Sequence, residues 1–239
     1  DWGQPPTHWL AAQGYGVLQP EFRGTGNSEG IAPYPFDPQE RRDGHEMVEW
    51  LAARPWCSGN VGIWGISYGG ITTMSIASTR PPHLRAIIPI SGTYDNYEFH
   101  LHPHGTQGLL IPDLDLGLMM VARNLLPPFI PDPEGRWADK WQARLEGNTP
   151  WILSWRGEPP DPDFWRRRRI PFERIDVPTL AISGWRDIYN GVMLEVYGAV
   201  AAPRRVVIGP WKHTVPPELQ PVMLRWWDRW LKGIDNGVD

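Results

Sequence analysis

The sequence predicts an α/β protein, with a mostly parallel sheet flanked by helices and an inserted helical cap. Short apolar runs typical of buried strands alternate with helical stretches toward both ends of the chain. A glycine-rich turn over residues 65–70 joins one such run to a helix. Between residues 93 and 171 the alternation stops, and Pro, Trp and charged residues dominate. We therefore expect a core made of residues 1–92 and 172–239, interrupted by a helical cap over residues 93–171.

Two elements open the core, a helix over residues 6–13 and a strand over residues 15–21. Pro20 cannot donate a hydrogen bond to a sheet ladder, so we expect this strand to be weakened or bulged. The pair Asp37–Pro38 is a typical helix start, because Asp caps the first amides and Pro suits the first helical position. This helix should run to about Ala53.

Four further apolar runs predict buried strands, over residues 61–65, 86–91, 179–183 and 205–208. A helix over residues 71–79 follows the first of them, and a crossover helix over residues 190–201 joins the last two. Pro89 makes the last pairings of the second strand doubtful. Within the cap, helical pieces are expected near residues 116–126 and 134–146.

A serine lies at the apex of the first turn. In Gly65-Ile66-Ser67-Tyr68-Gly69-Gly70 the glycines suit a tight strand-to-helix turn, which leaves little room for Cβ atoms. Such a turn lifts the Ser67 hydroxyl clear of the sheet at the N-terminus of a helix. There the Tyr68 amide can donate to a developing oxyanion. The pattern is typical of the nucleophile elbow of the α/β-hydrolase fold.

A serine nucleophile needs a base, and the base needs an orienting carboxylate. In this fold the chain order is Ser, then Asp or Glu, then His. Asp187 follows the strand at 179–183, and His213 follows the strand at 205–208. Because the carboxyl ends of parallel strands meet at the same edge of a sheet, we expect Ser67, Asp187 and His213 to form a catalytic triad.

Five short motifs follow one another along the chain: RGTGNSEG (Arg23–Gly30), WGISYGG (Trp64–Gly70), SGWRD (Ser183–Asp187), GPWKH (Gly209–His213) and WLKGIDNG (Trp230–Gly237). In this order they resemble the CocE/NonD hydrolases. That family includes cocaine esterase, α-amino acid ester hydrolases, glutaryl acylases and X-prolyl dipeptidyl peptidases. The resemblance covers nearly the whole chain apart from a divergent middle.

The resemblance implies Ser67 as nucleophile, His213 as base and Asp187 as the group that orients the base. It also implies the Tyr68 amide as one oxyanion donor and a tyrosine hydroxyl, from a segment that would precede Asp1, as the other. N-terminal strands and a C-terminal β-sandwich domain that packs on this core would likewise lie outside the sequence. We therefore expect a piece of a longer protein, which by itself is poorly soluble or weakly active.

The reaction expected is hydrolysis of a small-molecule ester or amide through a covalent serine ester, without any cofactor or metal. Ester cleavage is the first choice, and an X-Pro dipeptidyl-peptidase or a glutaryl-type acylase is the second. A hypothesis from another functional class is that the chain is a catalytically silent α/β-hydrolase-like binding module. Silent relatives usually lack a triad residue, whereas all three candidates are present here.

Three tryptophans, Trp64, Trp185 and Trp211, each adjoin a predicted catalytic loop. We hypothesise that they wall an acyl or leaving-group pocket. The alternative is ordinary packing at strand ends.

Two groups in the cap invite functional interpretations. On a strand, His100, His102 and His104 would share one face and offer a metal site, although a polar loop is the preferred interpretation because a serine mechanism needs no metal. Asp113 and Asp115 would suit a substrate ammonium, although acids at a helix start are the simpler explanation.

Composition excludes several classes of function. A formal net charge of −4 provides no basic field for nucleic acid, and the run Arg166–Arg169 is typical of a solvated helix end. No apolar run approaches the roughly 20 residues that span a bilayer, so no membrane partner is expected. The single Cys57 excludes an intramolecular disulfide. These features predict a cytoplasmic protein and leave its oligomeric state open.

Overall fold

The computed structural model describes residues 7–32, 34–101, 111–129, 135–155 and 162–238. Two compact units share the chain. The first, here called the sheet unit, consists of Asp1–Leu18, Arg41–Tyr94 and Ile170–Asp239. The second, the helical unit, consists of Gln19–Glu40 and Asp95–Arg169. Every residue that the sequence assigns to the triad belongs to the sheet unit.

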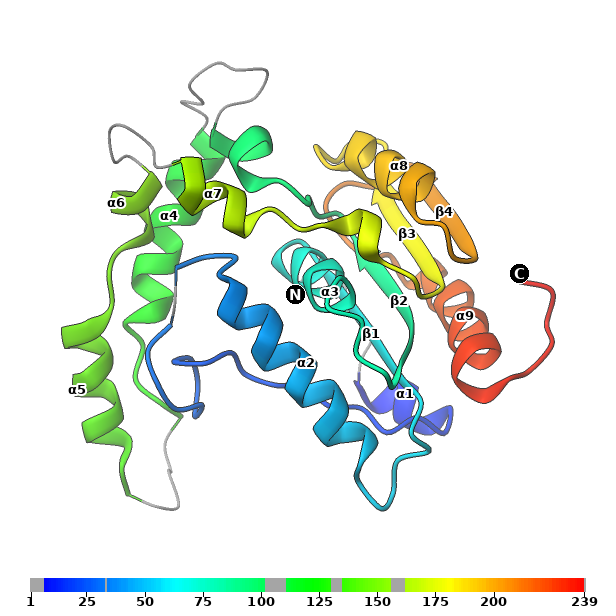
Figure 1. Ribbon diagram of the computed structural model, residues 1–239, viewed down its shortest axis with the longest axis horizontal. Helices are drawn as coiled ribbons and strands as arrows, with labels where there is room; N and C mark the ends of the chain where they lie inside the picture. The colour runs from blue at the N-terminus through cyan, green and yellow to red at the C-terminus, as the bar shows by residue number, and fades with distance from the viewer. Residues whose placement is uncertain (1–6, 33, 102–110, 130–134, 156–161, 239) are drawn as a thin grey trace. The chain divides into compact units, whose positions relative to one another are not determined.

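A parallel sheet forms the centre of the sheet unit. Its strands are β1 (Val61–Ile66), β2 (Leu84–Ile90), β3 (Thr179–Gly184) and β4 (Arg204–Gly209). They lie side by side in chain order, β1-β2-β3-β4, and each neighbouring pair is parallel (Figure 1). The four strands predicted over residues 61–65, 86–91, 179–183 and 205–208 are therefore confirmed, with shifts of one or two residues at most of their ends. All four carboxyl ends lie at one edge of the sheet.

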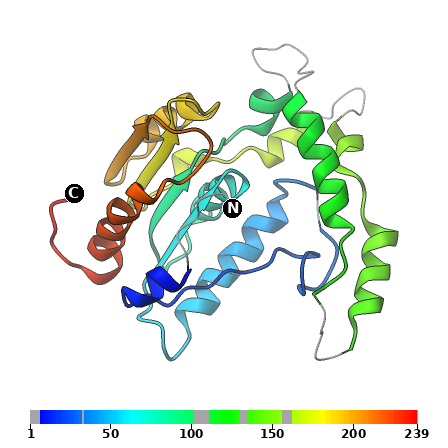
Figure 2. The same cartoon turned by 180° about the vertical axis from the view of Figure 1, so that it is seen from behind.

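Helices cover both faces of this sheet. They are α1 (Thr7–Ala12), α2 (Pro38–Ala52), α3 (Tyr68–Ala77), α8 (Asn190–Ala199) and α9 (Gln220–Lys232). The helices α3 and α8 lie on the face toward the viewer in Figure 1, and α1 and α9 lie on the opposite face, which Figure 2 shows. The strand residues Ala86, Ile88 and Ile90 join Met223 and Trp226 of α9 in one buried cluster. Burial on both faces explains why the strands are nearly continuous apolar runs.

The start of α2 shows how a local signal sets an element. The Gln39 amide donates to Asp37 Oδ1 at 2.8 Å, which confirms the predicted cap. Pro38 is the first helical residue. Its missing N–H costs nothing there, because the first amides of a helix have no intrahelical acceptor.

The strand predicted over residues 15–21 is wrong, because these residues adopt no strand in the structure. Val17 and Leu18 are 38% and 43% exposed. Pro20 has no N–H to pair, and in the α/β-hydrolase order another strand separates this segment from β1. The sheet of described residues contains no such strand, so the segment has no ladder to join.

The expectation that Pro89 weakens the last pairings of β2 is confirmed toward β3 and not toward β1. Pro89 keeps its register opposite Gly65 of β1. Toward β3 it has no N–H to donate, and the next bond on that side runs from Ser91 N to Ile182 O at 2.9 Å. The backbone of Ser91 is thus held against β3 directly after β2 ends.

The helical unit contains a π-helical turn, Tyr97–Leu101, and the helices α4 (Ile111–Asn124), α5 (Trp137–Gly147), α6 (Trp151–Trp155) and α7 (Pro162–Arg168). Helices α4 and α5 correspond to the predicted pieces at 116–126 and 134–146. Among the described helices, none is both long and apolar enough to cross a membrane.

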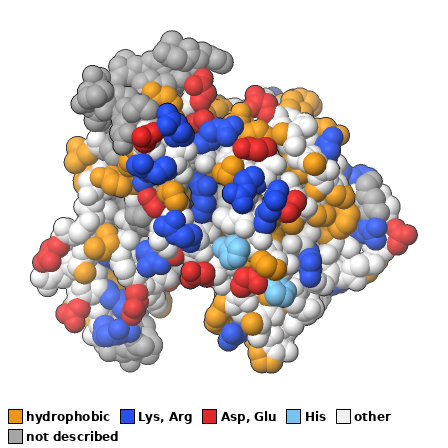
Figure 3. Space-filling view, viewed as in Figure 1, with side chains coloured by type: hydrophobic (Ala, Val, Ile, Leu, Met, Phe, Trp, Pro, Cys, Tyr) orange, Lys and Arg blue, Asp and Glu red, His pale blue; other side chains and the backbone are white. Residues whose placement is uncertain are grey.

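The run Arg166–Arg169 departs from its prediction in one residue. Arg168 has a side chain only 6% exposed, which pairs with Asp37. Its guanidinium carbon lies 3.5 Å from the centroid of the Phe164 ring. A solvated helix end is therefore wrong for Arg168, which is stabilised by an ion pair and a cation–π contact. Elsewhere, basic and acidic side chains are interspersed on the face that Figure 3 shows.

A polar cluster ties the end of α1 to α9 within the sheet unit. The Tyr15 hydroxyl donates to Asp228 Oδ1 at 2.7 Å. Lys232 Nζ lies 3.1 Å from the same oxygen and 3.9 Å from the centroid of the Tyr15 ring. Burial raises the pKa of Tyr15 well above its usual value, and Asp228 raises it further, so the phenol keeps its proton.

We expect Tyr15→Phe and Asp228→Asn to be coupled. Tyr15→Phe removes the donor and Asp228→Asn removes the charge of the acceptor, so each weakens the same bond; a hydrogen bond to a charged group stabilises a protein by about 1.5 kcal/mol. A double-mutant cycle on urea-unfolding free energies measures the coupling directly. Additive effects of the two substitutions would show that the Tyr15–Asp228 bond does not stabilise the fold.

Candidate active site

Ser67 follows β1 directly and is the cap residue of α3. Its φ of 61° and ψ of −121° lie outside the regions that most non-glycine residues adopt. Two backbone bonds hold it there, from Ser67 N to Ile90 O at 2.9 Å and from Ile71 N to Ser67 O at 3.0 Å. These bonds to the sheet and to the helix hold Ser67 in a strained backbone conformation, which is typical of a nucleophile elbow.

The glycines of the elbow differ in their need to be glycine. A Cβ on Gly65 would lie 2.6 Å from the backbone carbon and oxygen of Gly69, a distance that no real Cβ contact shows. A Cβ on Gly69 would meet no described atom within 4 Å. The expectation of little room for Cβ atoms is therefore confirmed at Gly65 and wrong at Gly69.

Asp187 lies in the loop after β3 and His213 in the loop after β4. The Asp187 side chain is only 1% exposed, and its Oδ2 lies 2.9 Å from His213 Nδ1. The other oxygen, Oδ1, accepts the Tyr189 amide at 3.1 Å. His213 itself is 27% exposed at its side chain. The structure thus brings together two of the three predicted triad residues by a direct hydrogen bond.

The electrostatics of Asp187 favour a carboxylate. Burial raises the pKa of Asp187, but hydrogen bonds from His213, Ser91 and the Tyr189 amide outweigh it, and the pKa lies below its usual value. An ionised carboxylate only accepts hydrogen bonds, so His213 Nδ1 carries a proton and donates it. In a neutral imidazole this leaves Nε2 as the basic nitrogen.

The loops that carry Asp187 and His213 are bonded to each other. Trp185 N donates to Gly209 O at 2.7 Å, and Arg186 N donates to Trp211 O at 3.2 Å. The contact is close: a Cβ on Gly184 would lie 2.2 Å from Trp211 O, and one on Gly209 would lie 1.9 Å from the Trp211 ring. Backbone hydrogen bonds between the two loops therefore help to fix the distance between the Asp187 and His213 side chains.

Two residues of the site escaped the sequence analysis. Tyr189 is 6% exposed, and its ring centroid lies 5.6 Å from that of His213. Ser91 is 1% exposed and follows β2. The available signal for Ser91 was its position, since it follows a strand just as Ser67 does.

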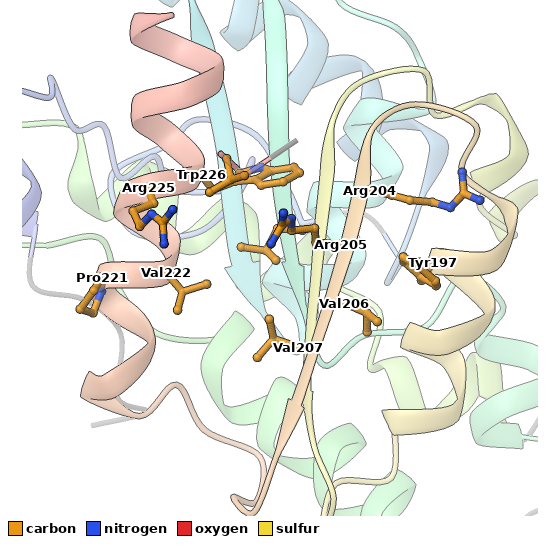
Figure 4. A pocket seen from close by; sticks show the side chains of 11 residues that line it. Tyr197, Arg204, Arg205, Val206, Val207, Pro221, Val222, Arg225 and Trp226 are labelled. Carbon is orange, nitrogen blue, oxygen red and sulfur yellow. The ribbon is translucent and has the colours of Figure 1, made fainter. Parts of the chain in front are cut away.

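The three predicted pocket residues lie in different surroundings. Trp64 and Trp211 pack against the buried core cluster, whereas Trp185 is 61% exposed. Only Trp185 therefore offers most of its ring to solvent. A separate groove of about 620 Å³ lies by α8, β4 and α9, and none of the predicted site residues lines it (Figure 4).

The structure describes only part of the histidines and aspartates that the sequence offers as ligands in the cap. His102 and His104 lie outside the described residues, and so does the side chain of His100. Asp113 and Asp115 are the third and fifth residues of α4, but their side chains lie outside the described part. Across the residues that the structure does describe, no group of three or more His, Cys, Asp or Glu side chains is suited to hold a metal ion.

Comparison with known proteins gives a consistent result. The family model described as X-Pro dipeptidyl-peptidase (S15 family) matches residues 1–215. Cocaine esterase of Rhodococcus sp. is 28% identical over 89% of this chain and 41% of its own length. An Xaa-Pro dipeptidyl-peptidase of Lactobacillus helveticus is 29% identical over 47% of this chain and 16% of its own.

Solved structures agree on the fold. A CocE/NonD family hydrolase from Staphylococcus aureus superposes with a TM-score of 0.75 at 25% identity, covering 91% of this chain and 36% of the other. The esterase Pf2001 of Pyrococcus furiosus, at 18% identity and a TM-score of 0.54, shares the fold. The α/β-hydrolase fold is therefore confirmed. The chain spans less than half the length of the curated relatives that it matches.

We expect Gly65→Ala to be far more damaging than Gly69→Ala. The first substitution forces a Cβ into backbone and should cost about 1–3 kcal/mol or more in the free energy of unfolding. The second enters open space on a helix and should be neutral or stabilising by up to about 1 kcal/mol. Urea unfolding of the two variants beside the wild type measures both effects. Equal losses would show that the close approach at Gly65 does not constrain the turn.

The low pKa of Asp187 predicts a pH-dependent contribution to stability. The unfolded value is near 3.8, so the stabilisation by the ionised carboxylate is complete above that pH and is lost as pH falls through the lower folded value. The difference in unfolding free energy between wild type and Asp187→Asn should therefore shrink from about pH 6 to about pH 3. Denaturant titrations at both pH values measure it. A constant difference would show that the folded pKa is not lowered.

Proposed function

Because the chain belongs to the X-Pro dipeptidyl-peptidase (S15) family, we propose that it is the catalytic part of a serine hydrolase that cleaves carboxylic ester or amide bonds. The observation that carries the proposal is the hydrogen bond between buried Asp187 and His213, at the sheet edge where the strained Ser67 turn also lies. Nucleophile, base and orienting carboxylate then come from loops after three strands of one sheet.

In the first half of the proposed reaction, Ser67 Oγ attacks the substrate carbonyl carbon while His213 Nε2 takes the hydroxyl proton. Asp187 holds the imidazole through Nδ1 and stabilises the cation that forms. Collapse of the tetrahedral intermediate breaks the bond to the leaving group, which receives the proton from Nε2. The product of this half is an ester between the acyl group and Ser67.

In the second half, His213 takes a proton from water as the water oxygen attacks the acyl carbon. Cleavage of the ester returns the proton to Ser67 and releases the carboxylic acid. In both halves the Tyr68 amide serves as an oxyanion donor, since it is the first amide of α3 and helix N-termini favour negative charge.

An ester is the proposed first substrate class, supported by the similarity to cocaine esterase over most of the chain. Cleavage after X-Pro is the second, supported by the family description and by the Lactobacillus peptidase. A glutaryl-type acylase rests on the resemblance of the motifs alone. A silent binding module would need no ionised, hydrogen-bonded Asp187 beside a histidine, so we favour catalysis.

The other parts of the proposal concern the whole protein. Residues 93–171 would act as the cap that selects the substrate, with the exposed Trp185 contacting its apolar portion. A C-terminal β-sandwich in the additional length of the relatives would pack on this core. The working compartment would be the cytoplasm.

We expect the full-length protein to hydrolyse p-nitrophenyl acyl esters faster than an X-Pro p-nitroanilide. Ser67→Ala should lower kcat on either by about 10⁴-fold or more, because nucleophile and base act as a unit. Initial rates over a series of acyl chain lengths measure this, and labelling by a fluorophosphonate reports the activated serine without assuming a substrate. Faster amide cleavage would assign the peptidase function. An unlabelled Ser67 would favour the binding module.

A further inference from the structure

Within the described sheet, β4 pairs with β3 alone. Just before β4 begins, Pro203 O accepts from Thr179 N at 2.9 Å, and at its end Gly209 O accepts from Trp185 N at 2.7 Å. The N–H and C=O of one strand residue point to the same side, and successive residues point to opposite sides. The odd-numbered residues of β4 therefore face β3, in agreement with both bonds.

The even-numbered residues Arg204, Val206 and Ile208 turn their backbone groups to the other side of β4. Among the described residues, no strand pairs with β4 on that side. Such a row of donors and acceptors is a template for a further strand. The apolar run 206–208 is half-buried, whereas all of β3 is buried, so the outer edge of β4 is partly open to solvent.

The groove of about 620 Å³ is lined from both faces of this edge (Figure 4). Its β4 lining is the consecutive run Arg204–Val207, whose side chains alternate between the two faces. Tyr197 of α8 lies on the face of Arg204, with the guanidinium carbon 5.4 Å from the centroid of its ring. Val222 and Trp226 of α9 lie on the opposite face. An extended segment fits this shape, because its own side chains also alternate between two faces.

Three arginines give the groove its charge. Arg204 and Arg205 begin β4, and Arg225 belongs to α9. Arg225 Nη2 donates to Asn236 O at 2.5 Å, and Asn236 Nδ2 donates to Arg225 O at 2.8 Å. Asn236 is neutral, so these bonds hold the Arg225 side chain in place without compensating its charge. None of the described residues that line the groove is acidic, so an acidic ligand is its electrostatic complement.

We propose that the outer edge of β4 is a docking site for an extended segment of a partner protein, which joins the sheet as a further strand. Acidic side chains of this segment meet the three arginines, and apolar ones pack against Val206 on one face and Val207 on the other. A second copy of the chain would instead bring the same arginines to both sides of the interface, where like charges repel. No predicted site residue lines the groove, so docking does not depend on the proposed hydrolase activity.

Binding of a synthetic peptide to the full-length protein is the main test. The probe is a fluorescein-labelled peptide of strand length, with glutamates at both ends and valines and threonines between them. Either strand direction then brings an acid to the arginines. Fluorescence anisotropy should show saturable binding that weakens as salt is added. The same peptide with N-methylated backbone amides cannot donate to the edge and should bind about tenfold more weakly or worse.

Val206→Pro is the matched change on the protein side. The N–H that it removes faces away from β3, so the pairing with β3 keeps its donors and the variant should fold, as circular dichroism can check. Its affinity for the peptide should fall about tenfold or more. Arg225→Gln should weaken binding by about 3- to 10-fold through loss of one charge. Arg123→Gln, which alters an exposed arginine of α4 that does not line the groove, should have no effect.

Hydrogen exchange reports on the edge without any substitution. In the full-length protein alone, the amides of Val206 and Ile208 should exchange faster than those of Val207 and Gly209, which pair with β3. Saturating peptide should slow the first pair and leave the second pair unchanged. Mass spectrometry at single-residue resolution measures the four rates.

Binding that needs the peptide amides and is lost in Val206→Pro supports the proposal. No saturable binding, or binding that survives both changes, overturns it. Amides of Val206 and Ile208 that are protected before peptide is added would show that the full-length chain covers the edge itself. A dimer that Val206→Pro dissociates, as seen by light scattering, would assign the edge to a second copy. Either of these results also overturns the proposal, and if Val206→Pro fails to fold, the N-methylated peptide decides.

Discussion

Parallel pairing of β1 to β4 is the constraint on which the rest of the site depends. It brings four carboxyl ends to one edge of the sheet, and each end supplies one polar side chain: Ser67, Ser91, Asp187 and His213 in chain order. The spacing of these groups follows from the spacing of the strands, so loops of ordinary length suffice. Cross-bonds between the last two loops then set the finer geometry of Asp187 and His213.

Local signals made much of this predictable. Apolar runs gave four strands within a residue or two at most ends, and Asp37 before Pro38 gave the start of α2. The elbow glycines and the chain order of the triad candidates could be recognised from the sequence, because each depends on a few neighbouring residues. Ser91 was not, because a buried hydroxyl acquires its partner only when β2 and β3 pair, and nothing in its own segment encodes that.

Two predictions failed where tertiary context outweighed a local pattern. Residues 15–21 have strand-like composition but no ladder to join, and Tyr15 is instead bonded to Asp228 of α9. Arg168 lies in a run of like charges, yet its side chain is buried against Phe164 and paired with Asp37. Charge runs predict solvent exposure on average, whereas an individual arginine follows whichever carboxylate and ring it reaches.

The contact of Trp211 with Gly184 and Gly209 has a consequence for how this edge can change over time. Any side chain at either glycine would collide with Trp211 as it now lies. A larger residue at Gly209 is therefore tolerated only after the Trp211 ring has been replaced, whereas one at Gly184 requires the backbone of residues 211–212 to move, and either change would disturb the loop carrying His213. Substitutions at these three positions therefore depend on one another, and the order in which they occur matters as much as their identity.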